Sequence, residues 1–208
     1  NSSLPVMLDV DNLIDYILMN FYAGNNDWDH HNWVAARNRV EPEKGFRFFS
    51  WDAEHLFTNA TLDVTKEDNA NCPSHLFTKL KDNSDFRMRV ADRIQQLFFG
   101  DGLLTPQSSA ARYLKRTKEI EKAILCESAR CGDYRRDVHS RDNDNDLYTP
   151  EKYWVKTLEW MTKTYFPQRS DLVVNQLRLS GLYPWINAPV FTHHGGQILM
   201  ETDLGMTA

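Results

Sequence analysis

Three residues near the start of the chain have the types and spacing of a phosphoryl-transfer centre. Asp27 and Asn32 lie five positions apart in a polar loop, and Asp52 follows twenty residues after Asn32. Phosphoryl transfer from a nucleotide needs one carboxylate that orients the acceptor hydroxyl. It also needs an amide oxygen and a second carboxylate to hold magnesium. Because Asp and Asn are common in turns for other reasons, this interpretation depends on the elements that position the three residues.

The predicted elements around these residues would bring them together. Leu8 to Tyr22 has apolar residues at helical spacing, so we expect a helix that leads directly into the polar loop. Residues 33–39 and 46–51 have the composition of two short strands joined by a turn-rich linker, which predicts a β-hairpin. A hairpin returns the chain to where it began, so Asp52 should lie close to Asn32. Protein kinases have this order of loop, hairpin and metal-binding carboxylate.

The remainder of the chain is predicted to be helical. Periodicity and start signals such as Thr-Pro indicate helices at residues 74–80, 85–99, 105–127, 149–165 and 170–180. The fold class is therefore mainly α with a small β-hairpin (α+β). We expect residues 1–181 to form the catalytic unit, and residues 182–208 to form an extended linker into a following domain.

Composition limits the function classes that fit the chain. It has 208 residues, of which 41% are hydrophobic and 12% aromatic, as expected of a globular domain. There are 24 Lys and Arg residues against 29 Asp and Glu residues, a formal charge of −5, which argues against general nucleic-acid binding. No apolar run approaches the length of a membrane span, and no signal peptide opens the chain. The start without Met suggests a fragment of a longer protein, and three cysteines are expected to be free thiols.

Several segments, in order, resemble those of the spore coat protein H (CotH) family. Asp27–Trp33 resembles its D…HN-aromatic loop, and Phe48–Glu54 is similar to its W-D-x-[DE] segment. Residues 76–80 and 86–93 match its helical body, and Glu127–Asp133 resembles its E-S-A-R-x-G-D stretch. The resemblance covers roughly residues 8 to 180.

The resemblance implies a fold like the C-terminal lobe of protein kinases and a Mg²⁺- and ATP-dependent transfer of phosphate to Ser or Thr of protein substrates. Asp27 would be the catalytic carboxylate, Asn32 and Asp52 would bind the Mg·ATP complex, and Glu54 would add a second metal contact. The family also implies surface or coat proteins of bacteria as partners, and an exported, cell-surface or spore-coat location. The nucleotide-clamping lobe, with its glycine-rich loop and phosphate-binding Lys, is expected to lie outside this chain.

Departures from ordinary protein kinases leave alternatives open. Asp29 stands where serine/threonine kinases usually carry Lys, and Ala53-Glu54 replaces Phe-Gly after the metal-binding Asp. One alternative is a pseudokinase or surface-interaction module that keeps the fold without transferring phosphate. The other is a metal-dependent hydrolase that uses His30 and His31 beside the acidic residues. Because adjacent residues seldom point at the same ion, we expect these histidines to orient the loop by hydrogen bonds instead.

Overall fold

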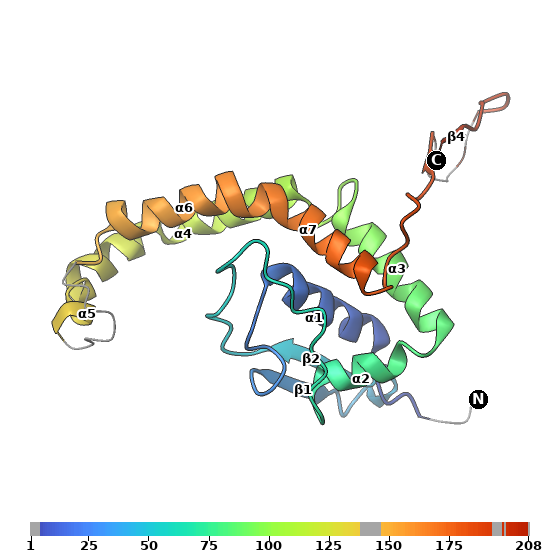
Figure 1. Ribbon diagram of the computed structural model, residues 1–208, viewed down its shortest axis with the longest axis horizontal. Helices are drawn as coiled ribbons and strands as arrows, with labels where there is room; N and C mark the ends of the chain where they lie inside the picture. The colour runs from blue at the N-terminus through green and yellow to red at the C-terminus, as the bar shows by residue number, and fades with distance from the viewer. Residues whose placement is uncertain (1–4, 138–146, 193–196, 198, 208) are drawn as a thin grey trace.

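The structure is a computed structural model that describes residues 5–137, 147–192, 197 and 199–207. As predicted from the sequence, it is mainly α-helical with a small antiparallel hairpin (Figure 1). The α-helices are α1 (Val10–Ala23), α2 (Pro73–Leu80), α3 (Ser84–Phe98), α4 (Pro106–Cys131), α5 (Tyr134–Asp137), α6 (Val155–Trp160) and α7 (Phe166–Leu179). The other elements are strands β1 (Trp33–Arg37), β2 (Phe46–Ser50), β3 (Val190–Phe191) and β4 (Met206–Thr207), the 3₁₀ turn η1 (Pro42–Lys44) and the π-helical segments η2 (Pro150–Trp154) and η3 (Met161–Tyr165).

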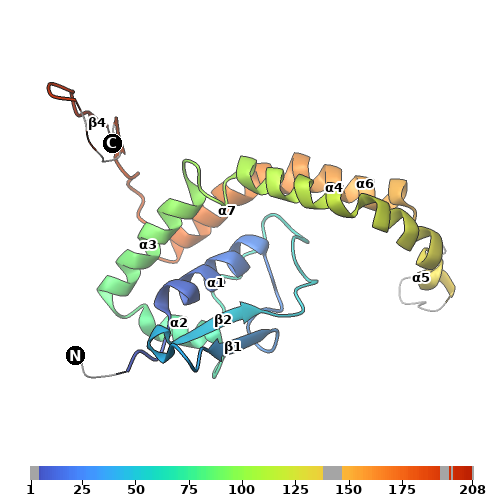
Figure 2. The ribbon, with the colours of Figure 1, turned by 180° about the vertical axis from the view of Figure 1, so that it is seen from behind.

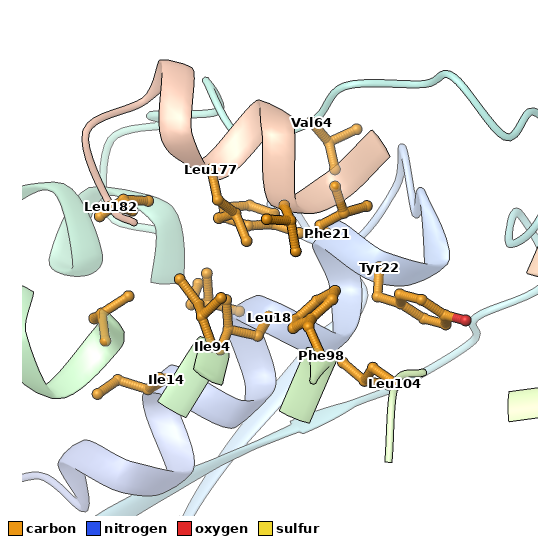
Figure 3. Close-up of a cluster of buried hydrophobic side chains, with 14 of the residues drawn as sticks. Ile14, Leu18, Phe21, Tyr22, Val64, Ile94, Phe98, Leu104, Leu177 and Leu182 are labelled. Atoms are coloured by element: carbon orange, nitrogen blue, oxygen red, sulfur yellow. The ribbon is translucent and has the colours of Figure 1, made fainter. Parts of the chain in front are cut away.

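Helix α1 lies at the centre of the packed body, with α2, α3 and α7 around it. The Asp9 side chain caps its start by accepting from the Asn12 N–H at 3.0 Å. Gly24 ends it in the left-handed conformation that glycine adopts most readily, with φ 58°. Most of the helix is buried, and Figure 3 shows its side chains facing those of α3 and α7 in one apolar cluster. The helix is therefore held on several sides, and the loop that follows it starts from a fixed point.

The hairpin has the predicted position and packs against α1. Its register pairs Trp33 with Ser50 at one end and Arg37 with Phe46 at the other. The Asn12 side chain of α1 makes two hydrogen bonds to β2. It donates to the Phe48 carbonyl at 3.2 Å and accepts from the Phe48 N–H at 2.5 Å. The strand register and these hydrogen bonds fix the position at which β2 ends beside the start of β1.

Gly45 lets the N-terminal segment lie along the hairpin edge. Its φ is 74°, and a Cβ there would come within 2.7 Å of the Leu8 backbone. The Phe46 N–H donates to the Met7 carbonyl at 2.9 Å, and the Asp9 N–H donates to the Phe46 carbonyl at 3.0 Å. The chain just before α1 is thereby fixed to β2.

Helix α4 runs beside α6 and α7 (Figures 1 and 2). The part of α4 beyond α7, together with α5, η2 and α6, extends from the body as a long arm. The sequence predicted two helices there, 149–165 and 170–180, but the structure has one continuous helical run from Pro150 to Leu179. The prediction of a break was wrong because the chain accommodates Pro167, which lacks an N–H, just after the π-helical segment η3. There the Phe166 N–H donates to the Met161 carbonyl five residues back.

The packed body extends slightly past the predicted boundary at residue 181. Leu182 and Tyr183 are buried, and the Tyr183 ring stacks on Phe99 with ring centroids 5.5 Å apart. From Pro184 the described chain leaves the body, and β3 pairs with β4 where an extended linker was expected. Part of that expected linker lies outside the described residues. Within the described part of the chain, no helix is both long and apolar enough to cross a membrane.

Candidate active site

The polar loop that follows α1 is held by buried hydrogen bonds. The Asn25 side chain donates to Asn20 Oδ1 at 3.0 Å, and its own oxygen accepts from the Asp27 N–H at 3.0 Å. The Tyr16 hydroxyl of α1 donates to the Trp28 carbonyl at 3.0 Å. Trp28 itself is only 1% exposed. These bonds hold the backbone around Asp27, although the buried Nε1 of Trp28 has no hydrogen-bond partner among the described residues.

Asp27 and Asn32 are in direct contact. The Asn32 side-chain Nδ2 donates to Asp27 Oδ2 at 2.7 Å, and Asn32 is buried while the Asp27 side chain is 19% exposed. Donation through the amide nitrogen leaves the amide oxygen Oδ1 free to act as a ligand. The structure thus brings together the first two residues of the predicted site.

The segment that carries Asp52 is attached to both ends of the loop. The Trp51 N–H donates to the Asn32 carbonyl at 3.0 Å, and the Phe57 N–H donates to the Ala23 carbonyl at 2.9 Å. Asp52 is exposed and has φ 46°, and Phe57 has φ 57°. Residues other than glycine seldom adopt this left-handed backbone region, so Asp52 and Phe57 are both held in a costly conformation. The hairpin thus returns the backbone before Asp52 to Asn32, as its topology predicted.

The Asp27 carboxylate also contacts the two histidines considered in the hydrolase alternative. Its Oδ1 lies 2.9 Å from His30 Nε2 and 3.3 Å from His31 Nε2, so both adjacent rings reach one carboxylate, contrary to the expectation for neighbouring residues. Glu54 and His55 pair with each other at 3.2 Å and have ligand atoms near Asp27. Among the described residues, two sets of three potential metal ligands share Asp27, one with His30 and His31, the other with Glu54 and His55. Asp52 belongs to neither set.

The oxygen donors near the loop suit a hard cation. Asn32 contributes an amide oxygen, and Asp52 and Glu54 contribute carboxylates, which are the ligand types that Mg²⁺ prefers in proteins. Of the two carboxylates, only that of Glu54 belongs to a cluster of potential metal ligands around Asp27 among the described residues.

A comparison with known protein families covers the segments that form this site. The family model described as CotH kinase protein matches residues 1–172, which include α1, the loop, the hairpin and the helices up to the first part of α7. The chain belongs to the CotH kinase family. No match was found among curated proteins or among solved structures. Membership in the CotH family indicates a kinase-like function.

In this CotH chain, Asp29 stabilises the fold next to the site. It is 2% exposed, and its Oδ1 accepts from the Ser74 N–H at 2.8 Å. Its Oδ2 accepts from Asn69 Nδ2 at 2.8 Å and from the Ser74 hydroxyl. Since Cys72 at the N-cap of α2 makes no side-chain cap bond, Asp29 supplies the cap from the loop instead. The missing cap residue before Pro73 was the only sequence signal of this role.

Arg169 of α7 is a second residue that sequence reasoning missed. It is fully buried and donates to the carbonyls of Phe21 and Tyr22 at 2.5 and 2.8 Å and of Ala60 and Leu62 at 2.6 and 2.8 Å. Burial lowers the pKa of this guanidinium. The side chain fixes the C-terminal end of α1, from which the loop with Asp27 and Asn32 starts. No local pattern distinguishes Arg169 from the surface arginines of the chain.

The E-S-A-R-x-G-D stretch of the CotH resemblance lies at the far tip of the arm, at the end of α4 (Figure 1). There the Tyr148 N–H donates to the Gly132 carbonyl at 2.8 Å, and the Ser128 hydroxyl donates to the Tyr148 carbonyl. These bonds join the end of α4 to the chain that enters the helical run from Pro150. In this structure the segment holds the tip of the arm together.

Proposed function

We propose that this chain is the catalytic lobe of a protein that transfers phosphate from ATP to Ser or Thr hydroxyls of protein substrates in a Mg²⁺-dependent reaction. The observation that supports this most is the 2.7 Å contact between Asp27 and Asn32, with the chain that carries Asp52 and Glu54 attached to both ends of their loop. Membership in a kinase family supports the same reaction class. Proteins of a bacterial cell or spore surface are the proposed partners, and this part rests on family membership alone.

Each residue has a separate role in the proposed reaction. The Asn32 amide fixes Oδ2 of Asp27, so Oδ1, which faces the exposed His30 and His31 rings, is the oxygen that would orient the acceptor hydroxyl and accept its proton. The Asn32 Oδ1 and the carboxylates of Asp52 and Glu54 would hold the metal. A Mg²⁺ ion held by these residues would supply positive charge to the phosphates during transfer. The buried bonds of the loop keep these groups in place without reorganisation.

Two substitutions separate these roles. Asp27→Asn should lower phosphate transfer at least ~10²-fold and leave Mg·ATP affinity almost unchanged, because the metal ligands remain. Asp52→Asn should abolish transfer and weaken Mg·ATP binding, because the charge that holds the metal is lost. Incorporation of labelled phosphate into protein measures transfer, and calorimetric titration with Mg·ATP measures binding.

The control is Asp171→Asn, an equal change at an exposed position on α7, which should alter neither measurement. Full transfer activity in Asp27→Asn would contradict the catalytic assignment, and unchanged Mg·ATP affinity in Asp52→Asn would contradict the metal assignment. Binding of Mg·ATP without transfer by the parent protein would favour the pseudokinase alternative. Release of phosphate or cleavage without nucleotide would favour the hydrolase alternative.

A further inference from the structure

The turn that carries Asp27 also places two imidazoles on the same carboxylate. His30 and His31 follow Asp27 by three and four positions, and both Nε2 atoms face its Oδ1, at 2.9 and 3.3 Å. The two rings lie edge to face, with centroids 4.0 Å apart. All three potential ligand atoms lie within 4.8 Å of one another.

These separations fit the coordination shell of a transition-metal ion. Zinc binds imidazole nitrogen and carboxylate oxygen at about 2.0–2.2 Å, so two ligands at tetrahedral angles lie roughly 3.3 Å apart. The two distances from Asp27 Oδ1 to the histidine nitrogens, 2.9 and 3.3 Å, are close to that value. Three protein ligands would leave a fourth position open to water or substrate, as in sites where zinc is exchangeable or catalytic.

The triad is held in place by the residues between its members. Trp28 and Asp29 are 1% and 2% exposed, and Asp29 is fixed to the start of α2. The side chains of His30 and His31 lie on the outer side of the turn and are 52% and 60% exposed. An ion from solution can therefore reach a site whose backbone is already ordered.

We propose that Asp27, His30 and His31 form a Zn²⁺ site within the catalytic loop. Imidazole nitrogen favours zinc over magnesium, which prefers oxygen ligands and keeps its water. The proposed magnesium ligands, Asn32, Asp52 and Glu54, are different residues. The two ions thus have separate ligand sets that adjoin at Asp27.

Zinc at this site would inhibit phosphate transfer, a consequence that rests on the proposed function. Oδ2 of Asp27 already accepts from Asn32 at 2.7 Å. An ion on Oδ1 therefore leaves neither carboxylate oxygen to receive the acceptor hydroxyl. The nucleotide and its magnesium ligands are untouched, so inhibition should act on the acceptor step and leave Mg·ATP affinity unchanged.

The site is tested first by direct binding, which is independent of activity. Titration of the metal-free protein with Zn²⁺ should show one site, and His30→Ala and His31→Ala should each weaken it about 10-fold or more. The matched control is His75→Ala, which removes an α2 histidine that is 41% exposed and paired with Asp68, and it should change nothing. Because both loop histidines are exposed, folding of the variants is expected to persist and is checked by circular dichroism.

Other outcomes overturn the assignment. Zinc affinity that is unchanged in the His30→Ala/His31→Ala double variant contradicts the site. A loss of binding in His55→Ala alone would place the ion with Glu54 and His55, and a loss in Cys126→Ser would place it on an exposed thiol. Either result contradicts the proposed site. Co²⁺ used as a second probe should give the strong visible absorption of a tetrahedral site in the parent protein and lose it in the double variant.

Activity measurements separate this inference from the proposed function. At fixed Mg·ATP, Zn²⁺ should inhibit the parent, and the residual activity of the double variant should need about 10-fold more Zn²⁺ for the same fractional inhibition. Zinc bound by the triad without inhibition of an active parent overturns the inhibitory role. A parent that binds zinc through the triad but transfers no phosphate at all contradicts the proposed function and leaves the metal site intact.

Discussion

At the scale of single residues, Arg169 shows how a buried charge fixes the start of the loop that carries Asp27. Its guanidinium makes hydrogen bonds to four carbonyls, two of them at the C-terminal end of α1, where the helix dipole is negative. It also lies 5.8 Å from the centre of the Tyr165 ring. The charge is thus compensated by oriented carbonyls and a π-face, which lets α7 hold both α1 and the chain at residues 60–62.

Replacement of Arg169 by Met should therefore destabilise the protein strongly. The change removes all of these bonds, although the carbonyls of Phe21, Tyr22 and Leu62 each keep one other donor, so the cost should be about 3 kcal/mol. Urea unfolding followed by fluorescence measures the change. Arg116→Met is the control, since this side chain is 79% exposed and paired with Glu119, and it should cost less than about 1 kcal/mol. Equal effects of the two substitutions would contradict the role given to Arg169.

At the scale of elements, the sequence predicted the helices and strands whose positions are set by local patterns of residues. The spacing of apolar residues between Leu13 and Phe21 places α1, and the turn-rich linker between two short strands places the hairpin. Their order brings Asp27, Asn32 and the chain before Asp52 together. The pattern did not predict the π-helical passage through Pro167, since a proline after a helical run normally signals an end. It also did not predict Arg169, because its carbonyl partners are more than a hundred residues away in the chain.

The cap of α2 by Asp29 leads to an element-scale prediction. Asp29→Ala removes the acceptor for the Ser74 N–H and hydroxyl and for the Asn69 amide, so stability should fall by about 2 kcal/mol. Hydrogen exchange should rise both at the start of α2 and in the loop around Asp27, because one side chain joins them.

The control for Asp29 is a cap that belongs to a single element. Asn83 caps α3 by accepting from the Asp85 and Phe86 N–H groups at 2.8 and 3.1 Å. Asn83→Ala should cost about 1 kcal/mol and raise exchange at the start of α3 only. If Asp29→Ala left exchange in the loop around Asp27 unchanged, the proposed coupling between the cap and the loop would be wrong.

At the scale of the whole molecule, the body and the arm differ in how much surface they bury. Helix α1 is buried along most of its length, whereas only Ser109 and Thr117 are buried among the 26 residues of α4, and no residue of α6 is buried. Apolar side chains remain exposed on the arm, including Leu125 at 61%. Since tertiary packing supplies most helical stability, the distal arm should open locally at a lower free energy than the body unfolds.

The same substitution placed in the two parts tests this difference. Ala123→Gly lies on the exposed surface of α4, and Ala91→Gly lies on α3, where Ala91 packs against the core. Each weakens its helix by about 1 kcal/mol through the greater backbone freedom of glycine. In the body that loss should appear in the global free energy of unfolding, measured with urea. In the arm it should appear as about fivefold faster hydrogen exchange in α4 and its partner α6, with the global value unchanged. A global loss of about 1 kcal/mol from Ala123→Gly would show that the arm unfolds with the body as one cooperative unit.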